Sequence, residues 1–316
     1  MTLQQRLGFA ASDRVLIVHA DDIGMCEATV SAWRELHGVS NMTSASAMAP
    51  CPWFPAAVEA AREAGESADM GLHLTLNCEW RDHYRWGPLT GTNTPSGLYD
   101  QSGYLHPLAS DTYQNANFEL AYQELAAQMQ RAQSLGLALS HLDTHMMTAL
   151  HPDLFQHVLT LSEQTQLPVL VPHYHDAQTL ANESHMPLEL CQRTSAQINT
   201  AAAQIQPIDA WACLPFGQYL SDEERLGWAS HVLKYYFTAP GVYCLIGHPA
   251  NDTPELRAIA ADWPTRVADR RLFGSAAFGA VIQQEGFKLI GMKALAALCS
   301  SHQASTQAKP QDCMPA

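Results

Sequence analysis

An alternation of short apolar runs with longer amphipathic segments constrains this chain more than any other feature. Three of the apolar runs are RVLIVH at Arg14–His19, MGLHLTL at Met70–Leu76 and GVYCLIG at Gly241–Gly247. Runs of this length predict buried strands, whereas Phe118–Leu135 and Pro152–Thr165 have the spacing of apolar residues that is typical of helices. A chain built from successive strand-then-helix units is expected to fold as an α/β protein with a parallel sheet.

About seven such units in one chain favour a (β/α) barrel of the TIM type, regular or irregular, with seven or eight strands. An open doubly wound sheet is the alternative. Its nucleotide-binding versions lose support because neither GxGxxG nor GxxxxGKS/T follows a predicted strand. The remaining strands are expected at Thr43–Met48, Leu137–Asp143, Pro168–Val171, Ala210–Leu214 and Phe287–Ile290, and further helices at Met25–His37, Phe54–Glu63, Ser221–Phe237 and Ser275–Glu285.

The chain is expected to form one domain over residues 1–299. A stretch at about 77–110, rich in glycine, proline, threonine and aromatic residues, predicts an insertion loop in that domain. The last residues, 300–316, are polar and predict a flexible tail. Hydrophobic residues make up 47% of the chain and charged residues 15%, which favours a well-packed core over disorder.

Charge and cysteine usage exclude several classes of partner and compartment. The formal net charge of −14 disfavours binding to nucleic acid or to anionic lipid. The 8 cysteines include no CxxC pair, so free thiols in a reducing compartment are expected. No apolar stretch approaches the roughly 20 residues of a membrane span. These features predict a cytoplasmic protein with a small-molecule substrate; the oligomeric state stays open, and a homo-oligomer is one possibility.

Ionisable residues stand at the expected carboxyl ends of several predicted strands, where barrel enzymes gather their catalytic groups. The first run ends in His19-Ala20-Asp21-Asp22, and His73 lies in the third. The fourth run ends in His141-Leu142-Asp143-Thr144-His145, and the seventh is followed by His248. The clustering of such residues at strand ends favours a functional site.

The residue types indicate one divalent cation held by one of the two aspartates and by two histidines, with positions left open for water and substrate. Two adjacent carboxylates repel each other unless a cation or a shared proton relieves them. A turn at Ile23-Gly24 could aim both inward, although an aspartate before a helix also serves as an N-cap. A lone histidine in an apolar strand, such as His73, is by itself more often a core residue.

Neighbouring residues predict supporting roles. On a strand, His141, Asp143 and His145 share one face, so Asp143 or His141 could orient a ligand histidine. His248 could supply a proton to a leaving group. The loop from Cys78 to Tyr104 carries aromatic residues, Trp86 among them, that could either stack on a sugar or an aryl group or pack the loop onto the barrel.

Five motifs, in order along the chain, resemble the YdjC/ChbG family of carbohydrate deacetylases. They are Ala20-Asp21-Asp22-Ile23-Gly24, Thr43-Ser44-Ala45-Ser46, Gly71-Leu72-His73-Leu74, His141-Leu142-Asp143-Thr144-His145 and Gly247-His248-Pro249-Ala250. The resemblance implies a β/α barrel-like fold and removal of acetyl groups from N-acetylated sugars. It implies that Asp22, His73 and His145 are metal ligands, that Asp21 is the general base and that His248 lies in the active site. The family's ion is magnesium or zinc, and two imidazoles favour zinc.

Two departures from the family pattern fall where the substrate is expected. Met146 and Met147 follow His145 where many members have further histidines, so the pocket is more apolar unless His151 compensates. His173 lies in a segment where many members have an arginine. We group Thr43, Trp86, His151 and His173, with His141 and Asp143, as residues that either support the metal ligands or contact the substrate, and the sugar stays open. A metal-dependent sugar isomerase or epimerase, or a non-catalytic metal- or sugar-binding relative, is the alternative function.

Overall fold

Seven parallel strands form the centre of the molecule in a computed structural model that describes residues 1–80, 84–216 and 220–307, the last eight by their backbone only. The strands are paired in the order β4-β3-β2-β1-β6-β5, and β7 pairs with the first half of β1. The α/β fold with a parallel sheet is thus confirmed. The bounds are β1 Arg14–Ile23, β2 Ser44–Ala47, β3 Met70–Leu74, β4 Leu139–Thr144, β5 Ala210–Cys213, β6 Gly241–Gly247 and β7 Phe287–Leu289.

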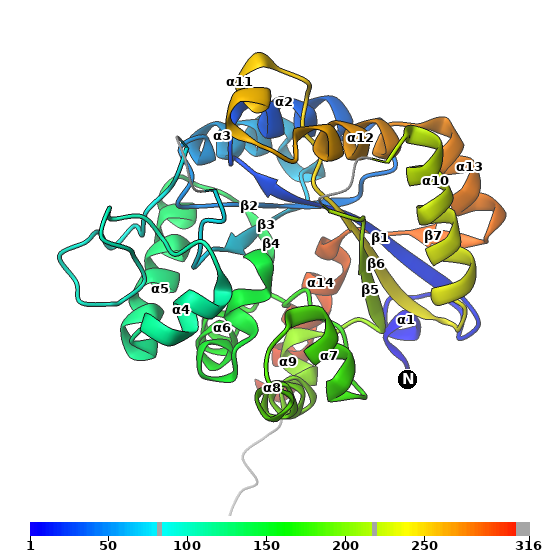
Figure 1. Ribbon diagram of the computed structural model, residues 1–316. Coiled ribbons are helices and arrows are strands. Elements are labelled where there is room, and N and C mark those ends of the chain that lie inside the picture. The colour runs from blue at the N-terminus through cyan, green and yellow to red at the C-terminus, as the bar shows by residue number, and fades with distance from the viewer. Residues whose placement is uncertain (81–83, 217–219, 308–316) are drawn as a thin grey trace, which may run out of the picture.

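Helices surround the strands, with α2, α3 and α12 along one side of the molecule and α4, α5 and α6 along another (Figure 1). The helices are α1 Leu3–Arg6, α2 Glu27–Leu36, α3 Phe54–Ala64, α4 Ala109–Asn115, α5 Phe118–Ser134, α6 Pro152–Thr165, α7 Ala177–Ser184, α8 Leu188–Thr200, α9 Ala202–Ile205, α10 Asp222–His231, α11 Pro254–Ile259, α12 Trp263–Phe273, α13 Ala276–Gln284 and α14 Met292–Gln307. Short 3₁₀ segments cover Gly65–Ser67 and His145–Leu150, and a π-helical turn covers Val232–Tyr236. In the part of the chain that the structure describes, no helix is long and apolar enough to cross a bilayer.

Irregular backbone links the two edge strands of the sheet. Leu142 of β4 pairs with Val169, and Pro172 pairs with Ile208, just before β5. The strand expected at Pro168–Val171 is therefore present only as isolated bridges, because the prolines at its ends have no N–H to donate to a ladder. The linkage of the edges fits the irregular barrel that the sequence predicts.

Alternate residues of β1 and β6 lie on one shared face of the sheet. This face changes from apolar to polar toward the carboxyl ends of the strands. Val15 and Ile17 of β1 pack in one cluster with Val242, Cys244 and Ile246 of β6. Residues of α1 and α14 belong to the same cluster and cover the amino ends of the strands. Further along the same faces stand His19 and Asp21 of β1 and, just after β6, His248. The strand alternation thus positions a polar site at the carboxyl ends.

The described parts of the expected insertion loop form mostly irregular backbone after β3, and α4 begins inside it at Ala109. Glu124 of α5 fixes this loop by accepting hydrogen bonds from the backbone N–H groups of Leu89 and Thr90 at 3.0 and 2.9 Å. Three helices, α7 to α9, occupy the region after His173, and α11 and α12 follow β6; the sequence did not predict these five. Helix α14 reaches Gln307, so part of the expected tail is helical backbone, while 308–316 lie outside the described residues.

A candidate metal centre

An irregularity in β1 aims two adjacent carboxylates into one cavity. The pairing of β1 with β2 shifts between Ala20 and Ile23, and Asp22 has a φ of 65°. Left-handed backbone is uncommon for residues other than glycine and concentrates at functional sites. Both Asp21 and Asp22 line the cavity. The sequence placed this change of direction at the Ile23-Gly24 turn; it lies instead within the strand, at Asp22.

Asp22, His73 and His145 converge at the centre of this site. Asp22 Oδ1 lies 3.5 Å from His73 Nε2 and 3.3 Å from His145 Nδ1, and these two nitrogens lie 3.3 Å apart. All three residues are buried. A tetrahedral ion with ligand bonds of about 2.0–2.2 Å separates its ligand atoms by roughly 3.3–3.6 Å. The three atoms therefore have the spacing that a zinc-like ion requires.

The protons on His73 can be assigned from its neighbours. Its Nδ1 lies 2.9 Å from Asp143 Oδ1. Because an ionised carboxylate can only accept a hydrogen bond, Nδ1 carries a proton, so Nε2 is the nitrogen that can offer a lone pair to an ion beside Asp22. Burial opposes ionisation of Asp143, but His73 and its other imidazole neighbours hold the pKa of this carboxyl well below its usual range.

His145 has the same arrangement with its two nitrogens exchanged. Its Nε2 lies 2.9 Å from Glu79 Oε2, which fixes a proton there, so that Nδ1 is the nitrogen that can offer a lone pair to an ion beside Asp22. The sequence expected Asp143 or His141 to hold His145. In the structure Glu79 holds His145, and Asp143 holds His73.

Asp22 Oδ1 is buried, faces the inner nitrogens of His73 and His145, and accepts no hydrogen bond of regular geometry from the described residues. Its other oxygen, Oδ2, accepts a hydrogen bond of 2.8 Å from the buried Arg266 of α12. Burial opposes the charge on Asp22, yet Arg266 and His145 hold the pKa of its carboxyl well below its usual range. Buried acceptors without a donor are costly, so the three converging atoms fit a bound cation.

The electrostatics of the ion-free site also favour positive charge at this point. Burial lowers the pKa of His145, but the carboxylates of Glu79 and Asp22 outweigh burial and raise it to about 10. Without an ion, a proton on the imidazole therefore supplies that charge. Metal ligands of this type must be deprotonated, so an ion and this proton compete for the same place.

Asp21 and His248 stand beside the centre. Asp21 Oδ2 lies 3.7 Å from His248 Nε2. The backbone N–H of His248 donates to Asp269 Oδ2 at 2.9 Å, and Phe216 packs edge-on against its ring at 4.1 Å. Burial lowers the pKa of His248 to about 4, so the imidazole is neutral at pH 7.

These groups open onto a cavity of about 1270 Å³. The wall facing the carboxylates is largely apolar and includes both methionines after His145, each with left-handed backbone at φ 50° and 56°. The apolar pocket expected from Met146 and Met147 is thus present. Other lining residues are Trp80, Tyr84, Leu108, Tyr113, Met186, Pro187, Trp211 and Phe216.

Four residues that the sequence predicts to support the ligands or contact the substrate are not among the described residues that line this cavity. Thr43 accepts a hydrogen bond from the Val18 N–H at 3.0 Å, at the amino end of β2. The Nδ1 of His151 caps α6, and His173 lies 3.3 Å from Asn199 Oδ1. Trp86 is buried, donates to the Asn77 carbonyl at 3.1 Å and packs edge-on 6.3 Å from the His145 ring. Trp86 thus supports a candidate ligand, and a role in substrate binding for any of these four stays a prediction.

Sequence reasoning missed three residues that complete the centre. Glu79 comes from an irregular loop and Arg266 from a helix that was not predicted. Neither residue belongs to a periodic sequence pattern that would identify it as part of a site. Ser46, whose hydroxyl lies 3.2 Å from His73 Nδ1, had a detectable signal, because Ser44 and Ser46 alternate along a predicted strand.

The fold and the site together define an α/β protein with a candidate metal centre at the carboxyl ends of its parallel strands. The chain belongs to the YdjC-like family, whose model matches residues 15–284. It is 35% identical over 269 residues to a carbohydrate deacetylase of Thermus thermophilus, an alignment that covers 85% of this chain and 89% of that protein. A carbohydrate deacetylase of Brevibacillus brevis is 33% identical over 157 residues, 50% of this chain and 59% of the relative.

A solved structure agrees in fold. A protein of Enterococcus faecalis with a proposed role in cellobiose-phosphate cleavage superposes with a TM-score of 0.71 at 22% identity, covering 90% of this chain and 99% of that one. At this identity the likeness concerns the fold alone.

Proposed function

We propose that this protein is a metal-dependent hydrolase that removes an acetyl group from an N-acetylated sugar. The observation that carries the proposal is the convergence of Asp22 Oδ1, His73 Nε2 and His145 Nδ1, which lie 3.3–3.5 Å from one another. The reaction class is supported by relatives that are carbohydrate deacetylases. Zinc suits a site with two imidazoles best, and magnesium is the alternative.

A divalent ion held by these three residues would lower the pKa of a water molecule and polarise the acyl oxygen. The residues of the chain supply the proton transfers. Asp21 accepts a proton from the attacking water. His248, neutral in the resting protein and 3.7 Å from Asp21 Oδ2, receives that proton and passes it to the departing nitrogen.

The remaining residues hold this arrangement in place. Arg266 fixes Asp22, while Asp143 and Glu79 fix the two imidazoles through their outer nitrogens. Such partners set both the orientation of a ligand ring and its basicity.

The test is acetate release from a panel of N-acetylated sugars with zinc or magnesium added. We expect wild-type protein to release acetate. Asp21→Asn should keep its metal and lose about 10²- to 10⁴-fold in kcat, the range for loss of a general base. Asp222→Asn, an exposed substitution 3.5 Å from Arg271, is the matched control and should keep full activity.

Two results would contradict the proposal. Full activity of Asp21→Asn would remove Asp21 as the base. If no N-acetylated sugar releases acetate in the presence of either metal, the deacetylase assignment fails. Formation of a ketose or an epimer instead would indicate the isomerase class.

A further inference from the structure

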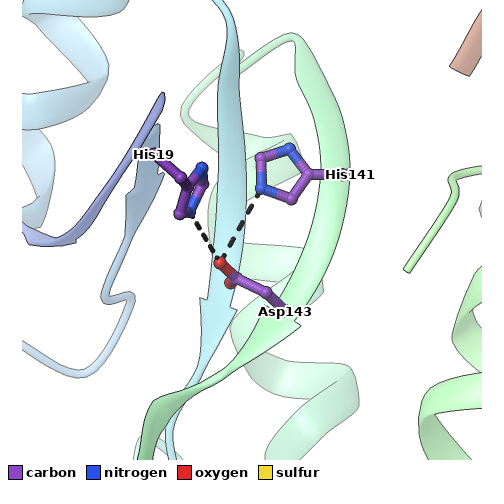
Figure 2. A group of neighbouring side chains, drawn as sticks. All are labelled: His19, His141 and Asp143. Carbon is purple, nitrogen blue, oxygen red and sulfur yellow. Dashed lines mark hydrogen bonds and ion pairs between the residues drawn. The ribbon is translucent and has the colours of Figure 1, made fainter. Parts of the chain in front are cut away.

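His19 has no part in the reaction as described, yet it lies at the centre of the charged residues. Its side chain is fully buried in β1. Figure 2 shows its imidazole and that of His141 on either side of Asp143, both directed at the same carboxylate. Desolvation disfavours the charged form of a buried histidine. The position of His19 among carboxylates therefore requires a physical explanation.

The contacts of His19 determine where its proton lies. Its Nε2 is 3.0 Å from Asp21 Oδ1 and 3.0 Å from Asp143 Oδ2, and Ser46 Oγ is 3.3 Å away. Both carboxylate oxygens can only accept, so Nε2 carries the proton and shares it between them. Burial lowers the pKa of His19, but these two carboxylates outweigh burial and raise it to about 9.

Each of the two carboxylates uses its other oxygen for a different part of the site. Asp143 Oδ1 receives the Nδ1 proton of His73 at 2.9 Å, while Asp21 Oδ2 faces His248 at 3.7 Å. One N–H group therefore joins the residue that orients a candidate metal ligand to the candidate general base. Without it, the carboxylates of the partly buried Asp21 and the buried Asp143 would repel each other at close range.

We infer that His19 is a positioning residue. Its N–H group holds the carboxylates of Asp21 and Asp143 next to each other, so that the general base and the ligand His73 keep fixed positions relative to each other. The inference rests on the function proposed above. It concerns a contact between side chains of this chain, so part of it can be tested without turnover.

A second cation is the competing explanation for the same cluster. His141 Nε2 lies 3.7 Å from Asp143 Oδ2 and has no hydrogen-bond partner among the described residues. With His19 and Asp143 it could in principle supply three ligands. An ion there would need the lone pair of His19 Nε2, whereas the shared hydrogen bond needs its proton. The two explanations therefore predict different metal content and different protonation.

The experiment compares His19→Gln with His19→Leu. Glutamine places its amide nitrogen the same number of bonds from Cβ as Nε2 of histidine, so it can donate to both carboxylates. Leucine cannot donate. We expect His19→Gln to keep kcat close to that of wild type, and His19→Leu to lose about 10- to 100-fold in kcat with KM unchanged. His157→Leu is the matched control: His157 is also buried, with its Nε2 3.0 Å from the Phe118 carbonyl oxygen, and its loss should leave kcat unchanged.

A second measurement uses wild-type protein labelled with ¹⁵N-histidine. NMR should show a slowly exchanging Nε2 proton that is missing in His19→Gln, and elemental analysis should give one divalent ion per chain in both proteins. This readout tests the hydrogen bonds of His19 even if wild-type protein releases no acetate. In that case the proposed function fails, and the contact of His19 with the two carboxylates is still tested.

Three results would overturn the inference. One is an equal loss of kcat in His19→Gln and His19→Leu. Another is a His19 Nε2 without a proton. The third is a second ion per chain that His19→Gln removes.

Discussion

Glu79 and Asp143 each face the outer nitrogen of an imidazole whose inner nitrogen points at Asp22. At the scale of residues, these two contacts decide which nitrogen keeps its proton and which offers a lone pair. Glu79 is a quarter exposed, so it is also the member of the centre nearest to solvent.

Glu79→Gln tests this role. The amide can still accept the Nε2 proton of His145, but it removes the negative charge that makes Nδ1 more basic. We expect metal affinity to fall by about 10- to 100-fold, measured by competition with a chelator. Glu183→Gln is the control, because Glu183 lines the same cavity and accepts from Tyr174 and Trp211 without touching the centre. Equal metal affinity of Glu79→Gln and wild type would exclude the role.

Proton release on metal binding is the second prediction at this scale. The pKa of His145 is raised to about 10 in the ion-free protein, so the proton is present at neutral pH and must leave when an ion binds. Affinity should therefore rise roughly tenfold per pH unit up to about pH 10. Calorimetry in two buffers with different ionisation enthalpies should count about one released proton. A metal affinity independent of pH between 7 and 9 would contradict this account.

The sequence could predict that the candidate ligands Asp22, His73 and His145 lie together, because they stand at strand ends, where a parallel sheet brings distant segments together. Their partners could not be predicted in the same way. Arg266 lies 244 positions after Asp22, and only the packing of α12 brings it close. A single charged residue in a loop or a helix carries no periodic signal, so its contacts follow from tertiary structure alone.

At the scale of elements, β3 and β4 are brought together by the absence of a side chain at Gly71. A Cβ at this position would lie 2.4 Å from the ring of His141, which is packed against it. The close approach keeps His141 beside Asp143, so a small residue in β3 supports the polar interior of β4.

Gly71→Ala should therefore destabilise the protein by roughly 1–3 kcal/mol, because the ring of His141 must move into a packed interior. Gly227→Ala in α10 is the control: a Cβ there meets nothing within 4 Å, and the helix should gain about 0.5–1 kcal/mol. Urea unfolding measures both changes. Equal stability of the two variants would show that the contact between Gly71 and His141 is looser than described.

Elements with strong periodicity were predicted well, and α6 agrees with the expected Pro152–Thr165 at both ends. It begins with a proline at its first turn, which has no N–H to leave unpaired. The helices α7 to α9 were missed because their segment is largely polar, and only a few residues of each are buried, among them Leu180, Cys191 and Ile198. Where tertiary packing decides the structure, a weak pattern gives little information.

At the scale of the whole molecule, the same strand faces form both part of the apolar core and the polar site. Their first halves pack as an apolar cluster with α1 and α14, and their ends present carboxylates and imidazoles to one cavity. Four carboxylates, of Asp21, Asp22, Glu79 and Asp143, gather around this point, and Arg266 contacts one of them directly. We expect a divalent ion held by Asp22, His73 and His145 to balance much of the remaining charge.

Anomalous X-ray diffraction from crystals grown with zinc tests this claim most directly. A single peak about 2.0–2.2 Å from Asp22 Oδ1, His73 Nε2 and His145 Nδ1 is expected, with Glu79 and Asp143 still bound to the outer nitrogens. A peak among His19, His141 and Asp143 instead, or no ordered ion near Asp22 at saturating zinc, would contradict the account.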